Sequence, residues 1–335
     1  MTTPTSTRTR PHAAATRGGS RLAALDRLRG LALVAMLFHH LLDWISGDAR
    51  EVIPGWRYFV VTDVAAVAFF CVSGASLALF ATSRRRRGAS RGAVAVEVLR
   101  RYGLLVPIGL LIHLAIFRTE YGFGVLEAIG ITVVAAASLL AVVPTRVLPA
   151  VAAGVLVLGP WLERRAADES GWVAEHLLGG TFPVVTYLGF VLVGVAASRH
   201  GLLGDRRGVQ LAAVVMSAGV ALLVVSGVEP DRYPGDAAFV LPGLAGTALA
   251  LAACQLTWPR VLRRFDRFVR DAGARALGLF IGHYLIYGLL QEAGWMRQVD
   301  QSWGVALAAA VTTGLCLLAP HVPQLPWSPR TGRRT

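Results

Sequence analysis

The stretch "RGLALVAMLFHHLLDWIS" (residues 29–46) decides the fold class, because it is long and apolar enough to cross a bilayer as a helix. It nevertheless contains two adjacent histidines, His39 and His40, and an aspartate, Asp43. Ionisable side chains in hydrocarbon are costly, and in membrane proteins they usually line pathways or sites. The stretch therefore predicts both a membrane-spanning helix and a functional site within it.

The composition of the whole chain supports this assignment. Of the 335 residues, 55% are hydrophobic and 16% are charged, and the mean hydropathy is +0.56, which is too apolar for a soluble domain of this size. The net charge of +13 does not indicate nucleic-acid binding, because the basic residues lie at the ends of apolar runs. Cys71, Cys254 and Cys316 all fall within apolar runs, so we expect buried thiols and neither a disulfide framework nor a metal site.

Apolar segments recur along the chain and predict an all-α bundle of about ten transmembrane helices. Residues 1–20 are expected to form a disordered cytoplasmic tail, residues 21–320 the transmembrane domain, and residues 321–335 a short basic cytoplasmic tail. The ten predicted spans are residues 29–46, 58–81, 102–117, 122–143, 146–161, 182–198, 208–227, 236–257, 273–291 and 303–319.

The distribution of arginine predicts the orientation of these spans. If both termini are cytoplasmic, 26 of the 33 basic residues fall on the cytoplasmic side and 7 on the other. The run Arg84 to Arg87 then lies in a cytoplasmic loop and is explained as a topology determinant, with ligand binding left open as a second use. Residues 163–180 face outward. We expect a multi-pass protein of the plasma membrane.

This orientation assigns a depth to the polar residues. His40 lies eleven residues after Arg29, roughly 16 Å along the helix and near the middle of the bilayer. Asp43 follows His39 and His40 by four and three residues, the spacings that put side chains next to each other on a helix, so it could orient either imidazole. Asp63 lies roughly 8 Å below the outer surface on the second helix and could face the same cavity.

Three further ionisable residues lie in later spans. Glu127 belongs to the outer half, His283 lies roughly 10 Å from the cytoplasmic end of the ninth span, and His113 is near mid-depth. Each also has a simpler explanation, because a histidine can hold two helices together and Glu127 can lie at the interface. The ionisable groups are nevertheless spread across the whole membrane.

Four segments carry a resemblance to a known family. "RLAALDRLRGLALVAMLFHHLLDW" (residues 21–44) resembles the first core helix of transmembrane acyltransferases related to heparan-alpha-glucosaminide N-acetyltransferase, in which a D-x-x-R-G-like element precedes a histidine or asparagine by about eleven residues. The spacing from Arg29 to His40 matches. "TDVAAVAFFCVSGASLALF" (62–80), "FGVLEAIGITVVAAAS" (123–138) and "FPVVTYLGFVLVGVAAS" (182–198) resemble later helices of that family in the same order.

The resemblance implies a membrane-embedded acyltransferase. It would take an acyl group, usually acetyl, from cytoplasmic acyl-CoA and pass it to an amine or hydroxyl of a sugar or glycan across the bilayer, without a metal. The implied roles are His40 or His39 as the reacting histidine, Asp43 or Asp63 as its orienting carboxylate, Arg27, Arg29, Arg100 and Arg101 as ligands of the CoA phosphates, and Glu127 and His283 as substrate-binding residues. One departure stands out: related enzymes carry the catalytic histidine in the loop after the first helix, and residues 45–59 contain none.

Two other classes of function remain open at this stage. A proton-coupled transporter would also place histidines and carboxylates across a bundle, although it would be expected to show an internal repeat. A non-catalytic membrane protein would tolerate the loss of these residues, and binding of acetyl-CoA would separate it from an enzyme. The sequence leaves open the acceptor, the acyl chain, N- or O-transfer, and the oligomeric state, a homo-oligomer included.

Overall fold

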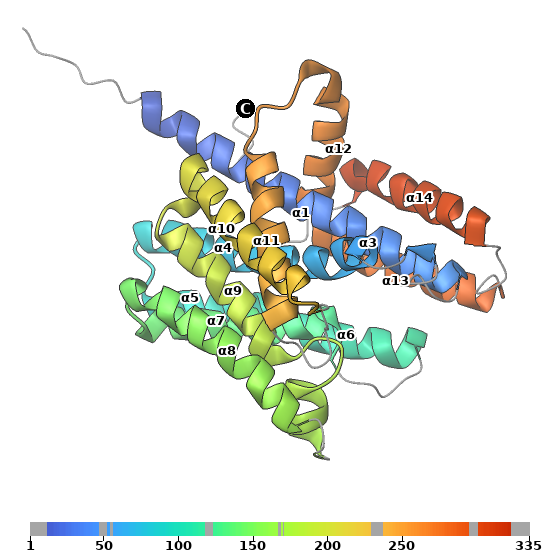
Figure 1. The fold of residues 1–335 in the computed structure, drawn as a ribbon, viewed down its shortest axis with the longest axis horizontal. Coiled ribbons are helices and arrows are strands. Elements are labelled where there is room, and N and C mark those ends of the chain that lie inside the picture. The colour runs from blue at the N-terminus through green and yellow to red at the C-terminus, as the bar shows by residue number, and fades with distance from the viewer. Residues whose placement is uncertain are drawn as a thin grey trace, which may run out of the picture.

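The computed structural model describes residues 12–46, 52–53, 56–117, 123–166, 169, 171–228, 237–294 and 301–322. This part of the chain folds into α-helices joined by short turns and loops, which confirms the predicted all-α class (Figure 1). The α-helices are α1 (His12–Ser46), α3 (Trp56–Phe59), α4 (Ala65–Arg86), α5 (Arg91–Tyr102), α6 (Leu105–Ile112), α7 (Val125–Val142), α8 (Leu148–Ala166), α9 (Val184–Arg199), α10 (Arg206–Val225), α11 (Ala237–Cys254), α12 (Arg263–Ala274), α13 (Ala276–Glu292) and α14 (Gln301–Leu317).

A helix of the described residues overlaps each of the ten predicted spans. Eight helical stretches in the described residues are long and apolar enough to cross a membrane, and a bent pair formed by α12 and α13 brings the number to nine. The remaining predicted span, residues 182–198, corresponds to α9, which is apolar but has only 16 residues. The chain is therefore a polytopic integral membrane protein.

Several boundaries differ from those expected. Helix α1 begins at His12, within the stretch 1–20 that was expected to be disordered, while residues 1–11 lie outside the described part of the chain. Most of the predicted C-terminal tail, residues 323–335, also lies outside it. The third span begins earlier than expected, because α5 and α6 run on as one apolar stretch from Arg91 to Ile116. A side-chain cap explains the start of α5 at Arg91, since the Ser90 hydroxyl accepts a hydrogen bond from the Ala93 amide.

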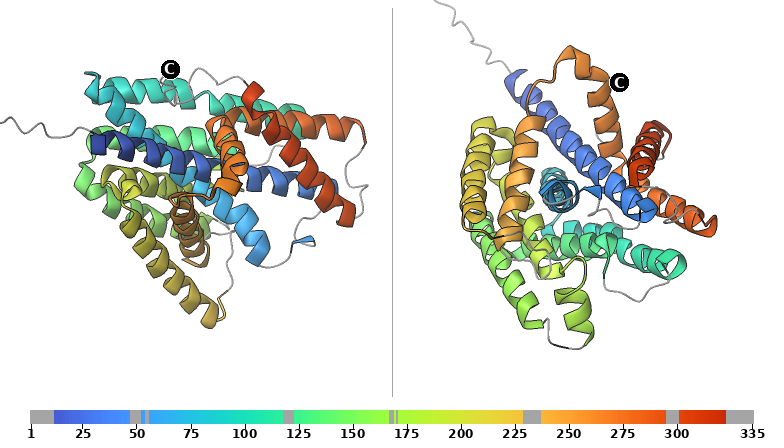
Figure 2. Two further views of the ribbon diagram at one scale, coloured as in Figure 1. Left: turned by 90° about the horizontal axis from the view of Figure 1, so that it is seen from above. Right: turned by 45° about the vertical axis from the view of Figure 1, so that its right-hand side comes forward.

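Helix α1 runs through the bundle beside α4, with α12, α13 and α14 packed along it (Figure 2). It packs against α4, α11, α12, α13 and α14, and its leucines at 33, 37, 41 and 42 are fully buried. A helix that is apolar all round is expected in the core of a membrane bundle. A residue on α1 can therefore meet partners from distant parts of the sequence.

Glycines allow two pairs of helices to approach closely. A Cβ added at Gly30 of α1 would collide with the Val269 carbonyl of α12, and one added at Gly273 of α12 would collide with the Asp26 carbonyl of α1. The same reciprocal arrangement, with Gly74 and Gly194, joins α4 and α9. Small residues at helix contacts are typical of membrane proteins, where van der Waals packing drives helix association.

Helix α12 runs across the direction of the other helices, standing upright in Figure 1, and meets α13 at a bend of 83°. It is strongly amphipathic: Val269, Ala272 and Gly273 are buried, whereas its arginines face outward. An amphipathic helix of this kind is suited to the membrane interface. Helix α12 brings Gly273 close to Asp26 and Gly30 of α1.

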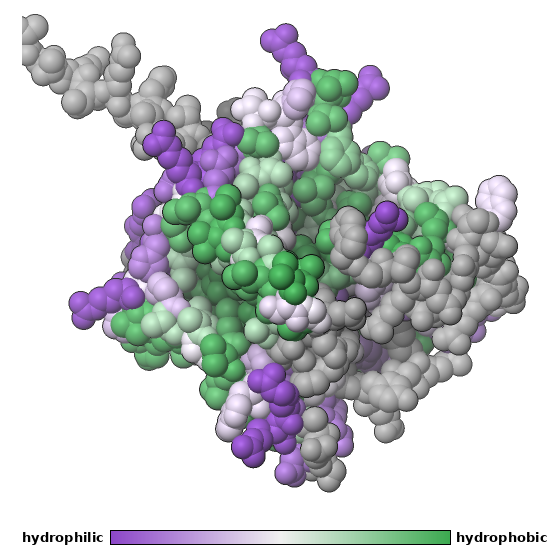
Figure 3. All heavy atoms as spheres, in the orientation of Figure 1, coloured by the Kyte–Doolittle hydropathy of each residue, from purple (hydrophilic) through white to green (hydrophobic). Residues whose placement is uncertain are grey.

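The surface agrees with a membrane environment. Apolar side chains cover the middle of the face seen in Figure 3, and hydrophilic ones gather at its edges. Helix α10 shows the pattern residue by residue, because Leu211, Val214, Val215 and Leu222 are each more than half exposed. Exposure of these apolar side chains to water would be unfavourable, whereas contact with lipid tails is not. All three cysteines are buried and unpaired, as expected.

Candidate active site

The centre of the site is a pair of histidines from α1 and α13. His40 Nδ1 lies 3.0 Å from His283 Nε2, and the His283 side chain is completely buried. The other nitrogen of His283, Nδ1, donates a hydrogen bond to the Phe280 backbone carbonyl. His283 was expected to bind substrate in the cytoplasmic half of the membrane, and the structure brings it into direct contact with His40.

These hydrogen bonds assign the tautomers when both rings are neutral. Because the Phe280 carbonyl can only accept, the proton of His283 must be on Nδ1, and its Nε2 must accept. His40 then donates from Nδ1, which leaves the lone pair of His40 on Nε2. The pair therefore presents His40 Nε2 as the nitrogen able to take up a proton.

Aromatic rings hold the two imidazoles in place. Trp44, one turn beyond His40, stacks on His40 with centroids 5.6 Å apart and on His283 with centroids 5.3 Å apart. Tyr287 packs on Trp44 at 4.0 Å, and Tyr284 packs on His283 at 4.1 Å. Stacked rings limit rotation of the imidazoles. These aromatic residues were not predicted from the sequence, although a spacing of four residues places Trp44 next to His40 on one face of the helix.

The remaining polar residues of this region occupy separate positions. His39 Nε2 lies 3.3 Å from the Tyr58 hydroxyl, so His39 and His40 face different neighbours. Asp63 is buried on a π-helical turn, Val60–Val64, and accepts a hydrogen bond of 2.9 Å from the Thr62 hydroxyl. Asp43 is half-buried on the next turn of α1. Nδ1 of His40 contacts His283, so an imidazole orients the ring at this nitrogen. The orienting role expected of Asp43 or Asp63 stays a prediction.

A second buried pair lies on α7 and at the end of α6. His113 Nδ1 is 2.9 Å from Glu127 Oε1, and only 1% of the Glu127 side chain is exposed. Two glycines make room for this pair: a Cβ added at Gly109 would lie 2.7 Å from Glu127 Oε1, and one added at Gly124 would lie 2.7 Å from His113 Cε1. Glu127 was expected to bind substrate in the outer half, and its partner His113 was expected only to hold helices together. The flanking glycines were the signal that sequence analysis missed.

A cavity of about 90 Å³ runs beside α1. Arg29 lines it together with Met36, and Phe280, whose ring packs 4.7 Å from that of His283, lines it as well. Arg29, Met36 and His40 share one face of α1, because spacings of seven and eleven residues are close to two and three helical turns. The other lining residues are Phe69, Ser73, Ser76, Tyr102, Leu105, Val125, Leu126, Ile129, Gly273, Ala274, Ala276 and Leu277. The cavity thus extends from the Arg29 guanidinium to Phe280, and the histidine pair lies behind the Phe280 ring without lining the cavity.

Arg29 is fixed at its end of the cavity by three contacts. Its guanidinium donates to the Ser76 hydroxyl at 2.6 Å, to Asp26 at 2.9 Å and to the Gly273 carbonyl at 3.4 Å. A guanidinium has five N–H donors in a planar fork, so a cation held in this way is already oriented for an anion.

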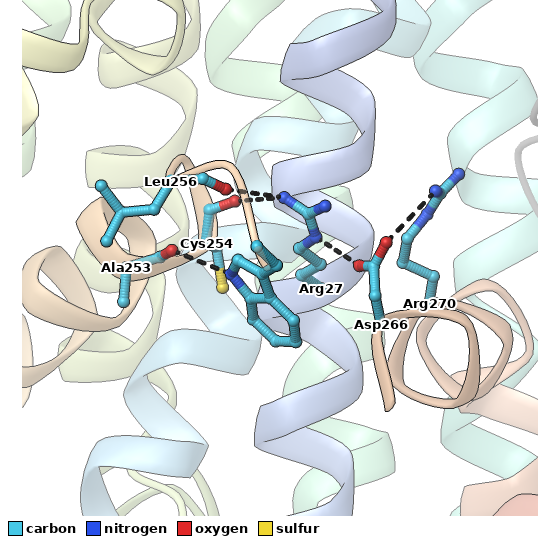
Figure 4. Close-up of polar contacts among 7 residues, drawn as sticks. Arg27, Ala253, Cys254, Leu256, Asp266 and Arg270 are labelled. Carbon is cyan, nitrogen blue, oxygen red and sulfur yellow. Dashed lines mark hydrogen bonds and ion pairs between the residues drawn. The ribbon is translucent and has the colours of Figure 1, made fainter. Parts of the chain in front are cut away.

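The other three arginines expected to bind CoA phosphates lie apart from this cavity. Arg27 donates to Asp266 at 2.6 Å and to the Cys254 carbonyl at 2.7 Å, and these contacts tie α1 to α12 and to the end of α11 (Figure 4). Arg101 forms an ion pair with Glu97 in the last turn of α5. Arg100 is exposed. The four arginines therefore do not form one cluster, and Arg29 is the one among them that lines the cavity.

Taken together, the helices and this buried histidine pair define a polytopic membrane protein with a polar site inside the bundle. The family model for the catalytic domain of heparan-alpha-glucosaminide N-acetyltransferase matches residues 21–230. The chain therefore belongs to this family of membrane acetyltransferases, and the resemblance seen in the sequence is confirmed. No curated protein matches the chain in a sequence comparison. The matched region includes His40 and Glu127 but ends before α13, which carries His283.

Proposed function

We propose that the chain transfers an acyl group, acetyl in the first instance, from cytoplasmic acyl-CoA to a sugar amine or hydroxyl on the other side of the plasma membrane. The observation that supports this most strongly is the His40–His283 pair, which lies behind Phe280 at one end of a cavity that is lined by Arg29. This arrangement provides an anion-binding group, a narrow apolar passage and, behind the Phe280 ring, a proton acceptor.

The donor would enter at the Arg29 end. A phosphate group of the donor is suited to a fixed guanidinium, and the pantetheine arm is narrow and uncharged. The cavity wall beyond Arg29 is mainly apolar, with Met36, Phe69 and Leu126 among its lining residues. A volume of about 90 Å³ corresponds to about three water molecules at ~30 Å³ each, which is comparable to the acetyl group of the thioester.

The reaction follows from the tautomers of the histidine pair. His40 Nε2 accepts the proton of the acceptor amine or hydroxyl as that group attacks the thioester carbonyl. The carbon–sulfur bond then breaks, and the departing CoA thiolate takes the proton from His40. While His40 carries the proton, its Nδ1–H remains hydrogen-bonded to His283, which is itself held by the Phe280 carbonyl. The acyl group ends on the acceptor and CoA leaves as the thiol.

The test uses sealed membranes that contain the full chain. Radiolabelled acetyl-CoA is supplied on the cytoplasmic side and glucosamine, as a probe amine, on the other. Labelled N-acetylglucosamine that depends on the protein and on His40 supports the proposal. Uptake of glucosamine driven by a proton gradient, without acetylation, would instead favour a proton-coupled transporter, and the absence of acetyl-CoA binding would contradict the proposal.

A further inference from the structure

A second cavity, of about 430 Å³, lies where the ends of α4, α7 and α9 meet the start of α5. Four arginines line it, namely Arg85, Arg86, Arg91 and Arg199. The remaining lining residues are Thr82, Leu140, Val143 and Thr145. The cavity belongs to the end of the bundle that the arginine distribution predicts to be cytoplasmic, and it includes two of the four residues in the run Arg84 to Arg87.

No carboxylate lines this cavity within the part of the chain that the structure describes. Other arginines at the same end of the bundle do have acidic partners. Arg84, next to the cavity residues in sequence, shares Glu97 with Arg101. Arg27 has Asp266. Four clustered guanidinium groups without a lining acid repel one another, and an anion would remove that repulsion.

Arg199 provides a second and independent observation. Its Nε is buried and has no hydrogen-bond partner among the described residues. A buried donor of a charged group that makes no hydrogen bond is expensive, and such groups in native structures usually have a missing partner. The Arg91 guanidinium donates a hydrogen bond of 3.1 Å to the Ala141 carbonyl, so its orientation on this side of the cavity is fixed.

We propose that this cavity binds a phosphate group. Arginine forks match the oxygens of phosphate in a bidentate way, and the hydroxyls of Thr82 and Thr145 add hydrogen-bonding groups to the wall. The phosphate could belong to the headgroup of an anionic phospholipid of the cytoplasmic leaflet or to a soluble nucleotide. Leu140 and Val143 offer an apolar edge against which an acyl chain of a lipid would pack.

The site is distinct from the cavity beside the histidine pair. Both involve α4, but Ser76 lines the first cavity and Arg85 the second. Nine residues on a helix correspond to a rotation of about 180°, so the two cavities open on opposite sides of α4. Binding at the second cavity can therefore be measured without any assay of acyl transfer, and its result does not depend on the proposed activity.

The test uses the purified full chain in a neutral detergent and follows its melting temperature. Two phosphate probes, monomeric dihexanoyl-phosphatidylglycerol and adenosine 3′,5′-bisphosphate, are titrated separately, with dihexanoyl-phosphatidylcholine as the zwitterionic comparison. The variant carries Arg85→Gln and Arg86→Gln, two exposed positions whose loss should not prevent folding. The matched control carries Arg206→Gln and Arg207→Gln, which remove the same charge from exposed positions of α10 outside the cavity.

We expect at least one phosphate probe to bind the wild type, and the variant at Arg85 and Arg86 to bind it about tenfold more weakly or worse, with the control unchanged. Stabilisation by the lipid probe alone identifies a headgroup, stabilisation by the nucleotide alone identifies a nucleotide, and both results support a phosphate site. The proposal is overturned if neither probe raises the melting temperature, or if the control at Arg206 and Arg207 loses as much affinity as the cavity variant.

Discussion

His40 and His283 are 243 positions apart in the sequence, yet His40 Nδ1 and His283 Nε2 lie 3.0 Å from each other in the core of the bundle. The contact joins α1 to α13 and orients the imidazole of His40, whose position in the sequence already indicated a site. Because His283 is in turn held by the Phe280 carbonyl, the direction of the hydrogen bonds is set from the buried end.

The first prediction concerns this pair. His40→Ala should reduce the rate of acetyl transfer by a factor of about 100 or more, because it removes the proton acceptor. Binding of acetyl-CoA, measured separately, should remain nearly unchanged. The matched variant His39→Ala removes a histidine whose partner is Tyr58, and it should retain most of the activity. If His39→Ala abolishes transfer and His40→Ala does not, the assignment moves by one residue.

The second prediction separates the orienting groups. His283→Ala should lower the rate of transfer less than His40→Ala does, because a proton acceptor remains but its tautomer and orientation are no longer held. Asp43→Asn and Asp63→Asn should also cost less than the loss of His40. Initial rates measured as a function of pH provide the check: the profile should change shape for His283→Ala, whereas a purely structural role would lower the rate equally at every pH.

The third prediction concerns the donor end of the cavity. Arg29→Gln should weaken binding of acetyl-CoA, measured by equilibrium binding, because it removes the guanidinium that lines the cavity. Arg100 is exposed, so a contribution of Arg100→Gln should be seen at low salt and fade as salt screens the charge. An affinity unaffected by Arg29→Gln would place the donor elsewhere.

The fourth prediction tests the packing around the buried Glu127. Gly109→Ala should destabilise the protein by about 1–3 kcal/mol, because the added methyl group overlaps the carboxylate in a closely packed site. Gly282→Ala is the control, since a Cβ at that helical position meets nothing within 4 Å. Melting temperatures in detergent provide the comparison. Equal stability of the two variants would show that Glu127 and His113 can move apart at little cost.

The fifth prediction is topological. The arginine asymmetry predicts that both ends of the chain are cytoplasmic, and residues 163–180 face the opposite side. Reporter fusions at Thr335 and within residues 164–178 should therefore give opposite signals. Matching signals would exclude the predicted arrangement of the spans.

Much of the architecture could be predicted from the sequence, because the bilayer sets a minimum length for each apolar segment. The lengths of the apolar segments predicted the positions of the spans. The spacing from Arg29 to His40 predicted one face of α1, and Arg29 and Met36 on this face line the cavity. The helix boundaries were less well predicted, as α1 begins at His12 and the third apolar stretch at Arg91. Helix ends at an interface are set by caps and local packing, to which an average over hydropathy is insensitive.

The sequence by itself determined that this chain is an all-helical membrane protein with ionisable groups at particular depths, because hydropathy and residue spacing are local properties. Only the tertiary structure decided that His40 meets His283, that Glu127 meets His113, and that Arg27 ties helices together while Arg29 lines the cavity. The physical reason is that helices which are apolar on every side carry little information on which neighbours they contact. Their choice of partner depends on close packing at glycines and on a few buried hydrogen bonds, and both of these join residues far apart in the chain.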